Sequence, residues 1–323
     1  MVYLDLEFKR KLRNLVMEIY VLGHKNPDTD AITSAIVFSR LLNSLDYGYD
    51  AIPFKLGKIN KETEYVLKKF KVPVPDTLER LAQNDNVALV DNNEPSQSID
   101  GIQNANIKYI IDHHKIKVSM REPVYCITKP VGCTATILYE LFKQNDVKID
   151  EQTAGLMLSA IISDTLLFKS PTCTIQDIKY AEILAKIAKI SNIEKYGREM
   201  LTAGADHTGY TPFQMIEIDT KEFSEKDIKF EISQINTIDM NEIFQRQDEF
   251  EKAINAKIKE KNLDLYVCTV TDIFNAKSKI IALGEKQELV EKAFGVTLYN
   301  NTKTLENVVS RKKQILPNIM DVL

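Results

Sequence analysis

Strand-like and helix-like segments alternate through the first two thirds of the 323-residue chain, and this alternation is what most limits its fold. The run EIYVLG at 18–23 is rich in β-forming residues, and the following DAITSAIVFSRLL repeats apolar residues at helical spacing. Further strands are predicted at 51–56, 86–91 and 107–112, and helices at 61–70, 132–144 and 151–162. Strands that alternate with helices pair in parallel, so we predict an α/β fold with a doubly wound, mainly parallel sheet.

A second, smaller α/β domain is predicted after a break in this pattern. Two glycines and a proline interrupt TAGADHTGYTP at 202–212. Strand-like DIKFEIS, LDLYVCTV and KIIALG follow, together with a long helix around 250–258. The predicted organisation is a first domain over 1–203 with an extra N-terminal segment at 1–16, a linker over 204–212, and a second domain over 213–323.

The composition is that of a globular protein. The 42 basic and 46 acidic side chains nearly balance, which gives no electrostatic reason to expect nucleic acid or a membrane surface as a partner. The longest apolar runs, such as AGLMLSAII at 154–162, are about half of the ~20 residues that a membrane span needs. The cysteines lie far apart without CxxC spacing, which predicts buried thiols in a reducing cytosol.

Acidic and histidine residues follow three of the predicted strands. His24 comes after the first strand, Asp91 closes NVALVD, and Asp112-His113-His114 closes the strand at 107–112. In an open parallel sheet, ligands bind at the carboxyl ends of the strands. We therefore expect these side chains to meet at one edge of the sheet.

Each of these residues also has an ordinary structural interpretation. Asp28 or Asp30 could cap the helix that follows, because short acidic side chains accept hydrogen bonds from free amides at a helix start. Asp91 could be a turn residue, and the histidine pair could be solvated. Asp164, in IISDTLLF, could simply end a helix.

Taken together, the pattern favours a metal centre. Of the four histidines in the chain, His24, His113 and His114 all fall in these clusters. Five aspartates at one sheet edge would repel one another unless cations lay among them. Carboxylates dominate the set and thiolates are absent from it, which favours manganese or magnesium over a closed zinc site. Two such ions ~3.5–4 Å apart can activate water, so phosphoryl transfer to water is the predicted reaction class.

A basic triplet, Arg311-Lys312-Lys313, lies in VVSRKKQILP. A solvated patch is the commoner outcome for such a triplet, but an arginine fork beside a lysine suits a phosphate. The sequence has no G-x-x-x-x-G-K-[ST] loop, no G-x-G-x-x-G and no Gly-x-Ser-x-Gly elbow. We therefore expect no P-loop, no dinucleotide-binding site and no covalent serine catalysis.

Six motifs resemble those of the family II inorganic pyrophosphatases of the DHH phosphoesterase superfamily: GHKNPDTDAITSAI, LVDNNE, IDHHK, PVGCTATIL, GLMLSAIISDTLLFKSPT and VVSRKKQ. The resemblance runs from about residue 17 to the C-terminus. It implies a two-domain α/β enzyme, with the active site between the domains, that hydrolyses pyrophosphate to two phosphates with a metal-bridging hydroxide as nucleophile. It also implies manganese or cobalt in two high-affinity sites, magnesium with the substrate, and a homodimer.

The same resemblance implies roles for individual residues. His24 and Asp28 would hold one metal, Asp30 and His113 the other, and Asp91 and Asp164 would bridge both. The substrate would be bound by His114, Lys221, Arg311 and Lys312, and the catalytic group would be His114, Asp91 and Asp164. Asp112 would support the site from behind the metal ligands, and Lys313 would be structural.

One position departs from the family pattern, in which many members have histidine where this chain has Asn92. Asparagine does not titrate near neutrality, so metal affinity, pH optimum or turnover is expected to differ. Two rival functions stay open: another DHH hydrolase that acts on short oligonucleotides, cyclic dinucleotides or polyphosphate, and a metal-dependent regulatory protein without turnover. The lack of a Gly-Gly pair argues against the nucleotide-handling relatives, and the intact six-ligand set argues against the regulatory protein.

Overall fold

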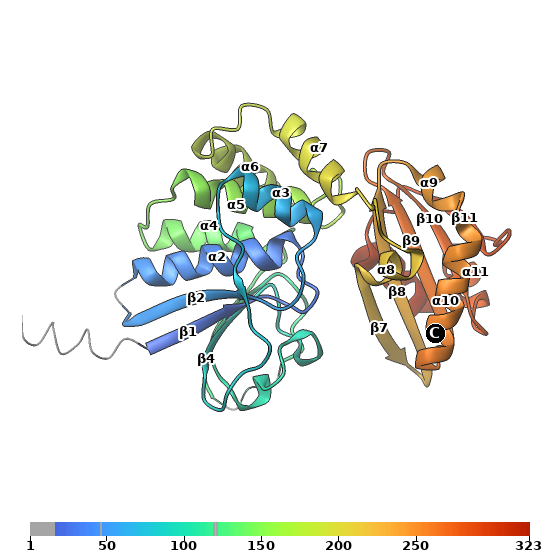
Figure 1. Ribbon diagram of the computed structural model, residues 1–323, viewed down its shortest axis with the longest axis horizontal. Coiled ribbons are helices and arrows are strands. Elements are labelled where there is room, and N and C mark those ends of the chain that lie inside the picture. Colours follow the sequence, from blue (N-terminus) through green and yellow to red (C-terminus); the bar gives the residue numbers. More distant parts are fainter. Residues whose placement is uncertain (1–16, 46, 119, 121) are drawn as a thin grey trace, which may run out of the picture. The chain divides into compact units, whose positions relative to one another are not determined.

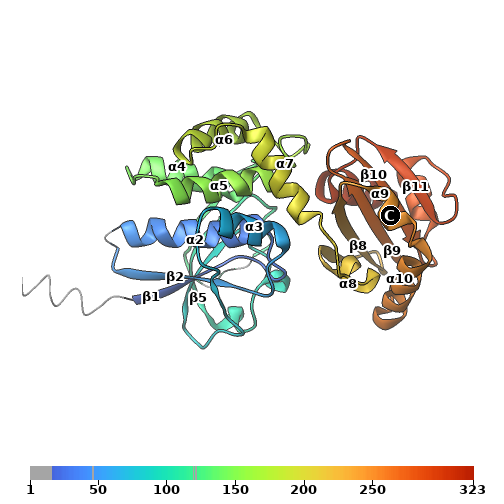
Figure 2. The same ribbon diagram turned by 45° about the horizontal axis from the view of Figure 1, so that its top comes forward.

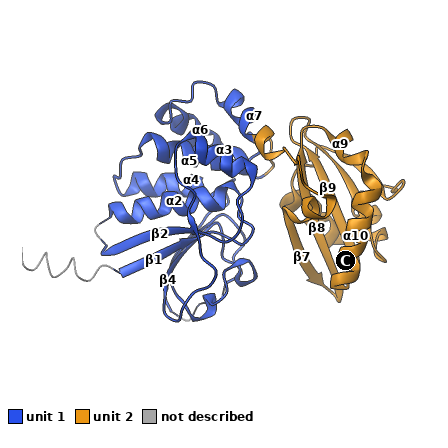
Figure 3. Cartoon of the chain, viewed as in Figure 1, with its two compact units in different colours: residues 1–168, 172–200 blue, residues 169–171, 201–323 orange. Residues whose placement is uncertain are grey.

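The computed structural model describes residues 17–45, 47–118, 120 and 122–323 (Figure 1). The chain divides into two compact units, one of residues up to 168 with 172–200 and the other of 169–171 with 201–323 (Figure 3). The extra segment predicted at 1–16 lies outside the described residues. The linker predicted at 204–212 falls between helix α7 (Ile193–Gly204) and helix α8 (Pro212–Glu217).

The described residues of the first unit form one sheet of six parallel strands. The strands are β1 (Met17–Leu22), β2 (Tyr49–Lys55), β3 (Asp76–Thr77), β4 (Asn86–Val90), β5 (Asn106–Asp112) and β6 (Tyr125–Thr128). Their order across the sheet is β3-β2-β1-β4-β5-β6, and each runs parallel to its neighbours. The predicted parallel sheet is confirmed, and its order reverses between β1 and β4, as in doubly wound folds.

Helices cover one face of this sheet in layers (Figure 2). They are α2 (Thr29–Ser44), α3 (Lys61–Lys69), α4 (Thr134–Gln144), α5 (Glu151–Asp164), α6 (Ile175–Ile187) and α7. Helices α2 and α4 contact the strands, α5 packs on α2, and α6 packs on α5. The connections between strands cover the opposite face, where Leu81, Ile99 and Ile102 pack against Leu22 and Leu89.

The described residues of the second unit form a mixed sheet of five strands with helices on both faces. The strands are β7 (Thr220–Glu225), β8 (Ile228–Thr237), β9 (Leu265–Asp272), β10 (Lys277–Leu283) and β11 (Thr302–Glu306). The order is β11-β10-β9-β8-β7; β8 and β9 are parallel, and the other neighbours are antiparallel. The helices are α8, α9 (Met240–Phe244), α10 (Gln247–Lys261), α11 (Glu288–Phe294) and α12 (Leu316–Val322).

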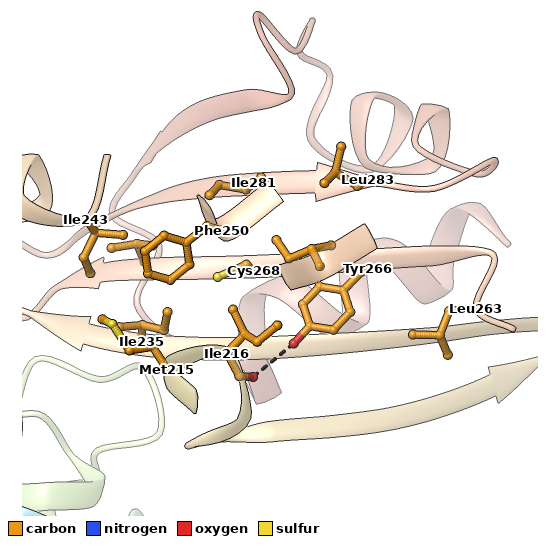
Figure 4. Packing of buried hydrophobic residues seen from close by; sticks show 12 residues of the cluster. Met215, Ile216, Ile235, Ile243, Phe250, Leu263, Tyr266, Cys268, Ile281 and Leu283 are labelled. Atoms are coloured by element: carbon orange, nitrogen blue, oxygen red, sulfur yellow. Dashed lines mark hydrogen bonds between the residues drawn. The ribbon is translucent and has the colours of Figure 1, made fainter. Parts of the chain in front are cut away.

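Apolar side chains of α8, α9 and α10 fill one face of this second sheet, and those of α11 and α12 fill the other. Tyr266 of β9 is fully buried in the first of these layers, in a cluster that also contains Met215 and Phe250, and its hydroxyl points toward Ile216 (Figure 4). Its hydroxyl donates to the main-chain oxygen of Ile216 at 3.0 Å, which satisfies the buried polar group. In the described part of the chain, no helix combines the length and apolarity that crossing a membrane requires.

Candidate metal centre

The strand order of the first unit brings three sequence clusters together. His24 follows β1, Asp91 follows β4 and His113 follows β5, and these strands are neighbours in the sheet. Because parallel strands end at the same edge, the side chains meet there, as the sequence predicted. Asp91 adopts a left-handed backbone conformation, with φ of 53°. Such a conformation is uncommon for residues other than glycine and concentrates at functional sites.

One group of potential metal ligands consists of His24, Asp28 and Asp91. Their ligand atoms all lie within 4.8 Å of one another. Nε2 of His24 is 3.4 Å from Oδ2 of Asp28 and 3.5 Å from Oδ2 of Asp91. A nitrogen and two carboxylate oxygens therefore converge on one position.

A second group consists of Asp30, Asp91, His113 and Asp164, whose ligand atoms also lie within 4.8 Å of one another. Nε2 of His113 is 3.4 Å from Oδ1 of Asp91 and 3.5 Å from Oδ2 of Asp164. Asp91 is thus shared, with Oδ2 toward His24 of the first group and Oδ1 toward His113 of the second. His113 is oriented through Nδ1, which lies 3.1 Å from the main-chain oxygen of Val131.

Asp28 has a geometry that is compatible with both interpretations that the sequence left open. It is the N-cap of α2, where Oδ1 accepts a hydrogen bond from the main-chain N–H of Ala31 at 2.9 Å. Its other oxygen, Oδ2, faces His24. Capping and metal binding use different oxygens of one carboxylate, so the two roles are compatible.

Asp30, in the first turn of α2, is fully buried and held from two sides. Oδ1 accepts from Oγ of Ser34 at 2.6 Å, and Oδ2 accepts from the main-chain N–H of Thr134 at 2.7 Å. Oγ1 of Thr134 also donates to Oδ1 of Asp91 at 3.1 Å. Thr134 therefore orients ligands of both groups. The sequence reasoning did not single it out, although it lies in the motif PVGCTATIL.

Asp112 orients His114 at the end of β5. Oδ1 of the buried Asp112 carboxylate is 2.9 Å from Nδ1 of His114 and accepts from the main-chain N–H of the same histidine at 3.0 Å. Nδ2 of Asn93 donates to Oδ2 of Asp112 at 2.5 Å. His114 also lies close to the ligands, because its Nδ1 is 3.4 Å from Oδ1 of Asp91.

The pKa values of the cluster are shifted in the way expected where several carboxylates lie close together. Burial raises the pKa of Asp30 to about 7, and the charge of Asp91 adds to the rise. Burial would lower the pKa of His24, but the carboxylates of Asp28 and Asp91 raise it well above its ordinary value. Carboxylates and imidazoles are suitable ligands for manganese, and a divalent cation would remove the repulsion among the aspartates. The residues present therefore fit a pair of such ions.

Asn92 is buried and turned toward its own loop. Its Nδ2 donates to Oγ of Ser98 at 2.8 Å, and its Oδ1 accepts from the main-chain N–H of Glu94 at 3.0 Å. Both ends of the amide are thus engaged in the turn after Asp91. The predicted effect of Asn92 on metal affinity, pH optimum or turnover stays a prediction.

The predicted phosphate-binding residues belong to the second unit. Lys221 lies in β7 opposite Ile232 of β8, and Arg311 and Lys312 begin a π-helical turn at Arg311–Ile315. Nη1 of Arg311 donates to the main-chain oxygen of Ile232 at 3.3 Å, so the guanidinium lies beside the strand pair that carries Lys221. Within this unit, the tertiary structure therefore brings together two cationic residues that are ninety positions apart in sequence.

Two protein-family models match the chain in succession. The DHH family N-terminal domain matches residues 18–161, and the DHHA2 domain matches residues 198–322. The first range contains the potential metal ligands from His24 to His113. The second range contains Lys221, Arg311 and Lys312. A model of an inclusion body protein also matches residues 103–246, a range that includes parts of both units.

Full-length relatives agree with this pairing of domains. A probable manganese-dependent inorganic pyrophosphatase of Bacillus licheniformis is 49% identical, over 95% of this chain and 99% of the relative. A protein of the same name from Bacillus cereus is 50% identical over 93% of this chain and 97% of the relative. Among solved structures, one described as a "putative family II inorganic pyrophosphatase" of Methanococcus jannaschii is 41% identical with a TM-score of 0.85, over 94% of this chain and 99% of that one.

Proposed function

Because this chain belongs to the manganese-dependent family II inorganic pyrophosphatases and hydrolyses pyrophosphate to two phosphates, we propose that it does so with two metal ions held by the two ligand groups. The observation that supports this most strongly is the position of Asp91. Its Oδ2 faces His24 and its Oδ1 faces His113, which is how a carboxylate that bridges two ions is placed.

The proposed ligands are His24 and Asp28 for one ion, Asp30 and His113 for the other, and Asp91 and Asp164 between them. Two ions bound there would lower the pKa of a water and neutralise charge on the phosphate oxygens. Asp164 lies within the second group, and its contact with both ions is part of the proposal. The names of the relatives specify manganese. We further propose that cobalt can replace manganese and that magnesium binds together with the substrate.

His114 is the proposed contact between the metal ligands and the substrate. Asp112 engages Nδ1 of His114 and fixes the plane of the ring, and in the proposal Nε2 contacts a phosphate oxygen. The side chain is 29% exposed, so a ligand can reach it. His114 would join Asp91 and Asp164 as the catalytic group.

Positive charge for the remaining phosphate oxygens would come from Lys221, Arg311 and Lys312. Metal ions rarely cover every oxygen of a phosphoryl group, and such reactions use lysine and arginine for the rest. Arg311 is suited to this task because its planar fork can hold two oxygens of one phosphate.

The proposal is tested by phosphate release from pyrophosphate after chelation and stepwise addition of manganese, cobalt and magnesium. Activity should disappear with chelation and return with manganese at a stoichiometry of two ions per chain. Tripolyphosphate and a dinucleotide serve as comparison substrates for the rival DHH hydrolase activities. One bound ion at full activity, or faster turnover of either comparison substrate, would contradict the proposal.

The proposal also includes a homodimer in the cytoplasm. Strand β6 ends the order of the first sheet, and Tyr125 and Cys126 on it are exposed, so a second copy could cover this edge. The sequence-based expectation of buried thiols holds for Cys133 and Cys268 but is wrong for Cys126, which lies on an edge strand. An exposed free thiol suits a reducing compartment. Light scattering of the protein should give twice the chain mass, and Tyr125→Lys should reduce the mass if β6 lies in the interface. A single-chain mass for the unaltered protein would contradict the dimer.

A further inference from the structure

Glu62 is a buried carboxylate that takes part in none of the roles above. It occupies the second position of α3, and only 9% of it is exposed. Its Oε1 accepts hydrogen bonds from two hydroxyl groups, Oγ1 of Thr29 at 2.6 Å and Oγ of Ser163 at 2.5 Å. Burial of a carboxylate is unfavourable unless hydrogen bonds compensate it, and here one oxygen receives both of them.

The two donors are sequence neighbours of proposed metal ligands. Thr29 directly follows Asp28 at the start of α2, and Ser163 directly precedes Asp164 at the end of α5. Glu62 therefore joins the helix end that carries Asp28 to the helix end that carries Asp164. Asp28 is a proposed ligand of one ion and Asp164 a proposed bridge between both ions, so the connection spans the proposed two-ion centre.

We propose that Glu62 is a positioning residue for the two-ion centre, and that it fixes the spacing between the ligand groups by holding Thr29 and Ser163 on one oxygen. This inference rests on the proposed two-metal function. Glu62 itself touches neither ligand in the described hydrogen bonds; it acts through the two hydroxyls. Residues of this kind affect metal affinity because they set the direction of the ligands.

Helices α2 and α5 are also joined by polar contacts at their other ends, and these contacts provide a matched control. Arg40, in the later part of α2, donates from Nη1 to Oγ1 of Thr153 at 2.9 Å and from Nη2 to Oε1 of Gln152 at 3.3 Å. Thr153 and Gln152 lie in the first turn of α5. If Glu62 only held α2 against α5, its loss should have the same effect as the loss of Arg40. Of these two contacts, the one made by Glu62 lies next to the proposed ligands.

The experiment compares Glu62→Ala, Glu62→Gln and Ser163→Ala with Arg40→Gln. Calorimetric titration of the metal-free proteins measures the affinity for manganese. The electron paramagnetic resonance spectrum of the loaded proteins measures the magnetic coupling between the two ions, which depends on their spacing. Thermal unfolding of the metal-free proteins measures the general effect on the fold.

Glu62→Ala should lower manganese affinity by about 10- to 100-fold and weaken the coupling, in the range expected for loss of a ligand-supporting contact. Glu62→Gln should retain most of the manganese affinity and most of the coupling, because its amide oxygen still accepts from the hydroxyls of Thr29 and Ser163. Ser163→Ala should give an intermediate loss. Arg40→Gln should lower the unfolding temperature while affinity and coupling stay as in the unaltered protein.

Unchanged affinity and coupling in Glu62→Ala would overturn the inference, and so would an equal loss of affinity in Arg40→Gln. If Glu62→Ala does not fold, Ser163→Ala decides, and unaltered affinity and coupling in it would overturn the inference. Absence of a coupled manganese pair in the unaltered protein would instead refute the proposed function. The two failures are therefore distinguishable.

Discussion

The guanidinium of Arg311 donates twice to Asp219, from Nη1 to the main-chain oxygen at 2.7 Å and from Nη2 to Oδ1 at 2.6 Å. With the donation to Ile232, these described contacts use three of the five N–H groups of the guanidinium. The proposed phosphate would meet the remaining edge of the guanidinium, formed by Nε–H and the other Nη2–H. Asp219 thus holds the fork in one orientation beside Lys221, which lies two residues further along the chain.

Replacement of Arg311 by lysine should lower kcat/KM for pyrophosphate by about 100-fold or more, the range for loss of an oriented donor to a reacting phosphoryl group. Lysine keeps the charge but has neither the planar fork nor the contacts with Asp219. Manganese binding should be unaffected. Lys313→Ala, on the same turn, is the control and should stay near the unaltered rate. A normal rate in Arg311→Lys would contradict the role of Arg311.

Asp91→Ala should lose metal and activity together, because Asp91 belongs to both ligand groups. The affinity for manganese should fall by more than about 100-fold, beyond the effect of losing an outer hydrogen bond. Asp100→Ala is a control of the same residue type, because Asp100 forms an exposed ion pair with Lys25 that contributes little. Calorimetric titration measures both variants, and retention of two ions in Asp91→Ala would show that Asp91 is no bridge.

Manganese affinity of the metal-free protein should rise with pH between about 6 and 8. The pKa of Asp30 is raised to about 7, so its carboxyl is mostly protonated below that pH, and the raised pKa of His24 keeps a proton on its imidazole. A metal ion must displace these protons, so affinity should fall about tenfold per pH unit for each proton displaced as the pH decreases. Titrations in buffers of different ionisation enthalpy count the protons released. An affinity that is flat from pH 6 to 8 would contradict this expectation.

Thr134→Val should lower manganese affinity by about tenfold, because it removes the hydroxyl that donates to Oδ1 of Asp91. Thr134→Ser is the matched variant, since it keeps that hydroxyl and should bind manganese as the unaltered protein does. The main-chain N–H that donates to Asp30 is present in both variants. The difference between them therefore isolates the hydroxyl, and equal affinities would remove Thr134 from the set of supporting residues.

The elements predicted from sequence are those with long or strongly apolar patterns. The strands expected at 18–23, 51–56, 86–91 and 107–112 correspond to β1, β2, β4 and β5, and the helix expected at 151–162 corresponds to α5. Strands β3, β6, β7 and β11 were not predicted, and β6 and β7 show why. β6 has four residues and an exposed first half, and β7 has mostly polar residues, so neither shows the alternation that marks a half-buried strand.

The six proposed metal ligands could be chosen from sequence, because strand ends mark where ligands gather and because charged side chains of one sign need a cation among them. Lys221 was named only through the family resemblance. The sequence also allowed Asp28 or Asp30 to cap the helix that follows. It could not separate cap from ligand, since both roles favour the same residue type. In the tertiary structure the two oxygens of Asp28 have different partners, so the cap and the proposed metal contact do not compete for one oxygen.

The sequence by itself determined the residue types of the centre, their places after strands and before helices, and the family to which the chain belongs. Only the tertiary structure decided that the two oxygens of Asp91 face different ligand groups, that Thr134 supports Asp30, and that Glu62 connects α2 with α5. The physical reason is distance along the chain. Local periodicity reports how one element buries its own face, whereas contacts between residues a hundred positions apart depend on how separate elements pack.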